Sequence, residues 1–190
     1  MLNVLRVLAL CSLIVAMARP RTVDVSNKTK TTKGIDIVMA IDVSGSMLAK
    51  DLKPNRMEAL KRVAGEFVEQ RPNDRIGIVV YASEAYTKTP VTSDKPLILD
   101  AINSIKYDNV LKDGTGIGMG LTTAVNRLKD SKAKSKVIIL MTDGVNNAGF
   151  IEPETASDIA QQYGIKVYTI GIGTNGMASS PYAYAPNGKS

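Results

Sequence analysis

The chain has 190 residues, of which 44% are hydrophobic, and this is enough for one globular domain with a sizeable core. It contains no histidine, which excludes Ser-His-Asp triads, imidazole general bases and the usual zinc sites. The single cysteine excludes an internal disulfide. Of the net charge of +6, +5 lies before Gly34, so the rest of the chain is nearly neutral and we expect no nucleic-acid binding.

The first 18 residues are apolar except for Asn3, Arg6 and Ser12. As a helix they would extend about 27 Å, which is marginal for the hydrocarbon core of a bilayer. We interpret residues 1–18 as a hydrophobic membrane segment. A cleaved signal peptide is the alternative, because Ala16-Met17-Ala18 has the small-residue pattern of a cleavage site. Residues 19–33 are polar and basic, and we expect them to form a linker.

From Gly34 onward, short apolar runs alternate with amphipathic segments. The apolar runs predict buried strands, and Tyr86–Val91, which contains Pro90, predicts an antiparallel edge strand. Buried strands are expected to begin at Ile35 and to cover 75–82, 137–141 and 166–171. Helices are expected at 57–68, 97–105, 117–128 and 155–163. Pro54 is expected to lie in the first turn of the first of these helices. This alternation predicts an α/β doubly wound domain with a mostly parallel sheet, preceded by a hydrophobic N-terminal helix.

Three oxygen-bearing side chains follow the first strand at alternate positions: Asp42, Ser44 and Ser46. Alternate residues of an extended segment project to one side, so these side chains can converge. Gly45 lets the backbone turn sharply around that point. Hydroxyls with a single carboxylate suit a hard divalent cation, which predicts Mg²⁺, with Mn²⁺ or Ca²⁺ as alternatives.

Two further oxygen donors are expected at the same edge of the sheet. Thr115 precedes a predicted helix, and Asp143 follows the predicted strand 137–141. Ligands of doubly wound sheets bind beyond the carboxyl ends of the strands, where these loops meet the one that follows the first strand. Taken singly, each residue has a simpler interpretation, as a turn former or as a helix cap. The predicted metal ligands are Asp42, Ser44, Ser46, Thr115 and Asp143.

These segments together resemble the metal-ion-dependent adhesion site (MIDAS) of von Willebrand factor type A (vWA) domains. The matching parts are Asp42-Val43-Ser44-Gly45-Ser46, Thr115 and Thr142-Asp143-Gly144, in the order of that family, and the resemblance covers residues 34–174. It implies that Ser44, Ser46 and Thr115 bind the metal through their hydroxyls and that the two aspartates act directly or through water. It also implies a non-enzymatic module whose metal is completed by an Asp or Glu carboxylate of a protein partner.

The apolar N-terminus followed by this domain is similar to the aerotolerance (Bat) group of bacterial membrane proteins. That resemblance implies a bacterial inner-membrane protein with a periplasmic vWA domain, and partners such as other vWA proteins or a MoxR-type ATPase. The positive-inside rule gives the opposite side, because more basic residues follow the apolar segment than precede it. The family also predicts another strand and helix after Thr174. Residues 175–190 are rich in Gly, Ser, Pro and Tyr and show no helical pattern, so we expect an irregular tail there and a truncated domain.

Two other functions remain as alternatives. One is a magnesium-dependent phosphohydrolase or phosphotransferase with Asp42 as nucleophile. It is disfavoured because position 44 is Ser rather than a second carboxylate, and because no Lys or Arg closely follows Asp143. The other is a structural subunit of an assembly linked to a MoxR-type ATPase. Asp36, in the first strand, is expected to be solvated and to have no role.

Overall fold

The computed structural model describes residues 3–9, 34–107 and 111–174. The chain divides into two units, Met1–Thr31 and Thr32–Ser190. In the first unit, residues 3–9 form a helix. Within the described ranges, no helix combines the length and the apolar character needed to cross a bilayer. Residues 10–18 of the predicted membrane segment, the linker 19–33 and the tail 175–190 lie outside the described residues.

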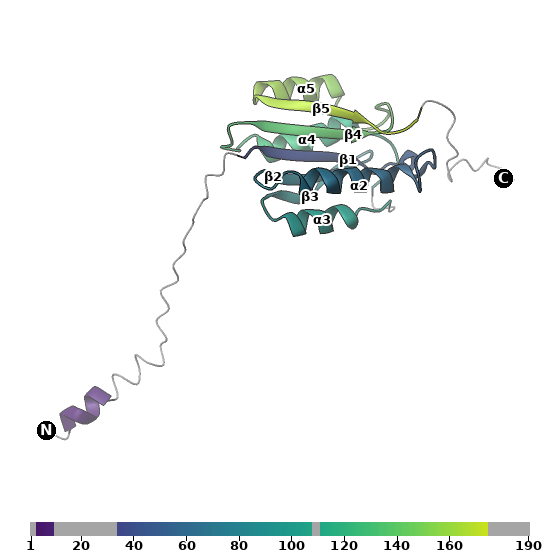
Figure 1. Cartoon of the computed structure of the whole chain (residues 1–190). Helices are drawn as coiled ribbons and strands as arrows, with labels where there is room; N and C mark the ends of the chain where they lie inside the picture. The colour runs from purple at the N-terminus through teal and green to yellow at the C-terminus, as the bar shows by residue number, and fades with distance from the viewer. Residues whose placement is uncertain (1–2, 10–33, 108–110, 175–190) are drawn as a thin grey trace. The chain divides into compact units, whose positions relative to one another are not determined.

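The second unit contains a five-stranded sheet with the strand order β3-β2-β1-β4-β5 (Figure 1). Its strands are β1 (Asp36–Asp42), β2 (Arg75–Tyr81), β3 (Ala85–Thr92), β4 (Lys136–Thr142) and β5 (Ile165–Gly171). Strands β2, β1, β4 and β5 are parallel, whereas β3 is antiparallel to β2. This confirms the predicted mostly parallel sheet with one antiparallel edge strand, and β3 is the strand that contains Pro90.

Helices cover both faces of the sheet (Figure 1). They are the 3₁₀ turn η1 (Gly45–Leu48) and the α-helices α2 (Arg56–Glu69), α3 (Lys95–Asn103), α4 (Ile117–Leu128) and α5 (Pro153–Gln162). Buried side chains of α2 and α3 pack with one face of the sheet, and those of α4 and α5 pack with the other. Every residue of β1 is buried, as expected for a central parallel strand covered on both faces. The carboxyl ends of the parallel strands therefore form one edge, to which several loops contribute.

The prediction for Pro54 is wrong. Helix α2 begins at Arg56, and Asn55 is its N-cap, because the Asn55 side chain accepts a hydrogen bond from the backbone N–H of Glu58 (2.8 Å). Pro54 lies before the cap and outside the helix. A proline near a helix start is compatible with either position, whereas the capping hydrogen bond fixes the boundary.

The prediction for Asp36 is also wrong, because this residue is 2% exposed. Arg75 Nε donates a hydrogen bond to Asp36 Oδ1 (2.8 Å), and the Ser131 hydroxyl donates to Asp36 Oδ2. Asp36 thus connects the start of β1 to the start of β2 and to the loop before β4. Its role is structural, at the edge of the sheet opposite the predicted metal ligands. The sequence did not reveal this because the partners lie 39 and 95 residues away.

Candidate metal centre

The structure brings the five predicted residues together at the carboxyl edge of the sheet. Ser44 Oγ and Ser46 Oγ lie 3.0 Å apart in the turn after β1. The Thr115 hydroxyl, from the loop before α4, lies 3.4 Å from Ser44 Oγ. The Ser46 hydroxyl donates a hydrogen bond to Oδ1 of Asp143, which directly follows β4 (2.8 Å). Three separate loops thus place hydroxyls and carboxylates in one cluster.

These hydroxyls are not used for capping, which was the simpler interpretation. Ser44 is at the N-cap position of η1, yet its side chain makes no capping hydrogen bond. The N-cap of α4 is Gly116 rather than Thr115, and the first N–H of that helix is accepted by the Asn146 side chain. In the turn after β4, the backbone N–H of Gly144 donates to the Thr142 hydroxyl, so the turn does not need the Asp143 carboxylate. Capping therefore does not account for the hydroxyls of Ser44 and Thr115 or for the Asp143 carboxylate.

Asp42 is a fully buried carboxylate at the end of β1. The backbone N–H of Ser44 donates to its Oδ1, and the Thr142 hydroxyl donates to its Oδ2, both at 2.9 Å. It forms no ion pair with any residue of the described ranges. Burial raises the pKa of Asp42 to about 6, against the effect of its hydrogen bonds with Ser44 and Thr142. A bound cation would favour the charged form, so this carboxylate fits a divalent-cation site.

Asp143 is held by an arginine that the sequence reading did not assign to the site. Its carboxylate side chain is 0% exposed, and Arg56 Nη1 donates a hydrogen bond to its Oδ2 (2.8 Å). Arg56 also binds both carboxylate oxygens of Asp51, at 2.8 and 2.9 Å. These hydrogen bonds hold the pKa of Asp51 well below its usual range. Arg56 is thus fixed at two points and orients the Asp143 carboxylate toward Ser46.

Three further polar side chains hold the loops of the cluster, and sequence reasoning missed all of them. They are Asp113, Asn146 and Asn147, whose side-chain oxygens accept backbone N–H groups of Gly45 (2.8 Å), Ile117 (2.8 Å) and Thr115 (2.7 Å). At Gly45 a Cβ would lie 3.1 and 3.2 Å from the Asp113 carboxylate oxygens, so the glycine permits this close approach. The sequence marks these positions only as polar residues in glycine-containing loops. Their partners, at 29 to 68 residues away, leave no periodic signal.

The donor set favours a hard cation that keeps an open position. No group of three or more Cys, Asp or Glu side chains within the described ranges is arranged to hold a metal. The cluster instead offers three neutral hydroxyls and two carboxylates, all oxygen donors, which suit Mg²⁺, Mn²⁺ or Ca²⁺. Ser44 and Thr115 are buried, whereas Ser46 is exposed, so the cluster reaches solvent on the Ser46 side. An approaching anionic group would have access from there.

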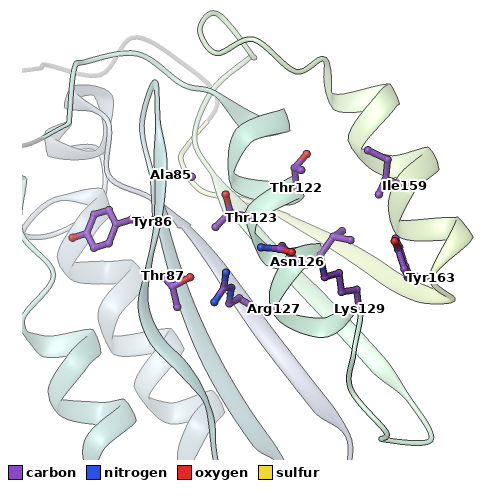
Figure 2. Close-up of a pocket in the computed structure, with 11 residues that line it drawn as sticks. Ala85, Tyr86, Thr87, Thr122, Thr123, Asn126, Arg127, Lys129, Ile159 and Tyr163 are labelled. Carbon is purple, nitrogen blue, oxygen red and sulfur yellow. The ribbon is translucent and has the colours of Figure 1, made fainter.

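A separate hollow of about 510 Å³ lies farther along α4, between β3 and α5. Figure 2 shows Thr123 and Arg127 of α4 near Thr87 of β3, with Ile159 of α5 and Tyr163, which directly follows that helix, on the other side. None of the five predicted ligands lines this hollow. The candidate metal centre at the sheet edge is therefore distinct from this hollow.

Two bacterial structures are similar to this chain over most of its length. Residues 36–182 match the sequence profile described as von Willebrand factor type A domain. An aerotolerance-related membrane protein from Bacteroides fragilis is 30% identical, with a TM-score of 0.73 over 83% of this chain and 77% of that one. The protein BatB from Bacteroides thetaiotaomicron is 32% identical, with a TM-score of 0.67 over 77% and 75% of the two chains.

Two further comparisons bear on the site and on the length of the protein. Proximal thread matrix protein 1 from the mussel byssus, whose MIDAS motif is occupied by zinc, is 27% identical, with a TM-score of 0.61 over 73% of this chain and 38% of that one. An uncharacterized protein of Borreliella burgdorferi is 34% identical over 88% of this chain and 49% of its own length. The chain thus spans about half the length of the curated relatives it matches. The matched profile and the two bacterial structures show that the chain belongs to the von Willebrand factor type A family, in its aerotolerance-related (Bat) group.

Proposed function

We propose that this domain binds a protein partner through one divalent cation, with Mg²⁺ as the resident ion. The hydroxyls of Ser44, Ser46 and Thr115 would hold the cation, with Asp42 and Asp143 acting directly or through water. The observation that carries this proposal is the approach of two other hydroxyls to Ser44 Oγ, at 3.0 and 3.4 Å. Neutral hydroxyls leave much of the positive charge on the ion, so a carboxylate of the partner would complete its coordination.

The choice of metal rests on the chemistry of these donors. Oxygen-only ligands suit Mg²⁺, with Mn²⁺ and Ca²⁺ as alternatives. The zinc in the MIDAS motif of the mussel protein supports a divalent cation at the corresponding place in this chain. Zinc usually takes Cys or His ligands, and this chain has no histidine, so zinc is a less suitable resident ion here.

The geometry of Asp42 argues against the phosphohydrolase alternative. A nucleophilic carboxylate must reach the reacting phosphorus, but Asp42 is 0% exposed and both of its oxygens accept hydrogen bonds. A non-enzymatic binding role is therefore the better interpretation. The alternative of a structural subunit in an ATPase-linked assembly differs from it only in the identity of the partner.

The relatives support part of a proposal for the localisation of the protein and for its partners. The similarity to a membrane protein of Bacteroides fragilis supports membrane association. We propose that the membrane is the bacterial inner membrane, that residues 1–18 are the membrane segment, and that the vWA domain faces the periplasm. In this proposal the partner is a protein that presents Asp or Glu, such as another vWA protein or a MoxR-type ATPase.

Removal of the Asp143 carboxylate tests the metal site. We expect Asp143→Ala to lower the Mg²⁺ affinity measured by calorimetry by at least about tenfold, because one of the two carboxylates of the site is lost. The fold should persist, since Arg56 keeps its two hydrogen bonds to Asp51. Asp158→Ala, at an exposed position of α5, is the matched control and should bind Mg²⁺ like the wild type. Equal Mg²⁺ affinity of the Asp143 variant and the wild type would contradict the assignment.

A further inference from the structure

Two large apolar side chains project into solvent beside the candidate metal centre. Val145 is 82% exposed and Phe150 is 95% exposed, which are the highest values for large apolar residues in the described ranges outside residues 3–9. Both belong to the loop between β4 and α5, which begins with Asp143. Single exposed apolar residues are common on soluble proteins, but two of them on one loop next to a binding site indicate a contact surface.

This loop is firmly attached, so the exposure is a feature of the fold. The side-chain oxygens of Asn146 and Asn147 accept the backbone N–H groups of Ile117 and Thr115. The backbone N–H groups of Asn147 and Ala148 donate to the Thr115 carbonyl oxygen, at 3.0 and 3.3 Å. Residues 146–148, which lie between Val145 and Phe150 in the sequence, make these four hydrogen bonds. They hold the loop against the start of α4. The two apolar side chains have no comparable packing and stay in water.

Both side chains flank the loops that supply the proposed ligands. Val145 is two residues after Asp143. Gly149, the residue before Phe150, has a positive φ of 91°. A Cβ at Gly149 would lie 3.4 Å from the Cα of Gly116, so the backbone is close to the Thr115 loop at this point. We define Val145 and Phe150 as the apolar rim. The glycine before each of these residues lies close to the Thr115 loop, since a Cβ at Gly144 would lie 3.8 Å from Thr115 Oγ1.

We propose that the apolar rim selects partner segments in which the metal-binding carboxylate is flanked by large apolar residues. This inference rests on the proposed function, because the cation must first bind the carboxylate. The cation then recognises the charge, and the rim recognises the neighbouring side chains by burying them together with Val145 and Phe150. Exposed aromatic residues of this kind often contribute most to binding when a partner covers them.

Fluorine NMR with short peptides tests the proposal. The chain has only two phenylalanines, Phe67 and Phe150, so 4-fluorophenylalanine labelling gives two signals. Acetylated Leu-Asp-Leu and Ser-Asp-Ser amides are titrated in Mg²⁺, with Leu-Asn-Leu as the uncharged control. We expect Leu-Asp-Leu to bind about tenfold more tightly than Ser-Asp-Ser, a difference of about 1.4 kcal/mol, and to shift the Phe150 signal. Phe67, which lies 5.0 Å from the Arg71 guanidinium, is the internal control and should not shift.

A substitution at the rim separates it from the metal. Phe150→Ser should remove the preference for Leu-Asp-Leu and leave Mg²⁺ affinity unchanged. Tyr163→Ser, at an exposed aromatic position that directly follows α5, should keep the preference. Equal affinities for the two aspartate peptides, or a preference that survives Phe150→Ser, would overturn the inference. Binding to phosphatidylglycerol vesicles that depends on Phe150 and not on Mg²⁺ would overturn it in favour of a membrane contact. If no aspartate peptide binds in Mg²⁺, the proposed function itself fails.

Discussion

Thr115→Val is expected to weaken Mg²⁺ binding by at least about 100-fold, since it removes one of the three hydroxyl ligands and keeps the shape of the side chain. Thr115 is 3% exposed and its hydroxyl lies 3.4 Å from Ser44 Oγ. The free energy of unfolding should change by less than about 1 kcal/mol, because the loop is held by backbone hydrogen bonds that the substitution leaves in place. Calorimetric titration with Mg²⁺ and urea unfolding measure the two effects.

The same substitution at Thr122 is the control, since this residue lies on α4 beyond the metal centre. Thr122 Oγ1 is buried and has no hydrogen-bond partner among the described residues. Thr122→Val should therefore leave Mg²⁺ affinity unchanged and should not lower stability, because an unsatisfied polar atom is replaced by a methyl group. If both valine variants bind Mg²⁺ like the wild type, Thr115 is not a ligand.

Gly118→Ala should destabilise the domain by more than about 3 kcal/mol, the range of severe packing conflicts. A Cβ at Gly118 would lie 1.9 Å from the Ile151 carbonyl oxygen, so α4 and the loop before α5 would have to separate. Both are backbone segments and cannot yield in the way a flexible side chain can. Urea or thermal unfolding measures the loss, and Mg²⁺ binding should weaken with it, because the same loop holds Thr115.

Gly65→Ala is the matched control in the middle of α2. The only atom near a Cβ at that position is Leu99 Cδ2, at 3.8 Å, which is ordinary contact. Alanine favours helix over glycine by up to about 1 kcal/mol, so this variant should be as stable as the wild type or more stable. A loss of less than about 1 kcal/mol at Gly118 would show that the contact between α4 and the loop is looser than described.

The strands and helices could be predicted because their signals are local. The apolar run of β1 and the apolar stripe of α2 each depend on residues a few positions apart. Pro90 likewise identified the edge strand β3 from a single local property, its missing N–H. The start of α2 was misplaced because Pro54 and Asn55 are both typical of helix starts, and only the hydrogen bond to Glu58 distinguishes them.

The residues around the metal centre were harder to predict. Asp42, Ser44 and Ser46 form a short pattern with a chemical meaning, and the order of Thr115 and Asp143 after them completes a family resemblance. Arg56 is the first residue of α2 and donates a hydrogen bond to Asp143, which lies 87 residues later. No local pattern in the sequence indicates this contact. Asp36 was misjudged for the same reason, since its partners are distant in sequence. Side chains that act through long-range hydrogen bonds require the three-dimensional structure.

The most direct test of the metal centre is the anomalous diffraction of Mn²⁺ in crystals of the domain. We expect one strong anomalous peak at the carboxyl edge of the sheet, within about 2.5 Å of the hydroxyl oxygens of Ser44, Ser46 and Thr115. This distance is typical of oxygen ligands of hard divalent cations. The peak should disappear in Thr115→Val crystals and remain in Thr122→Val crystals. A peak only elsewhere, or no peak at these hydroxyls at saturating Mn²⁺, would contradict a metal centre formed by these residues.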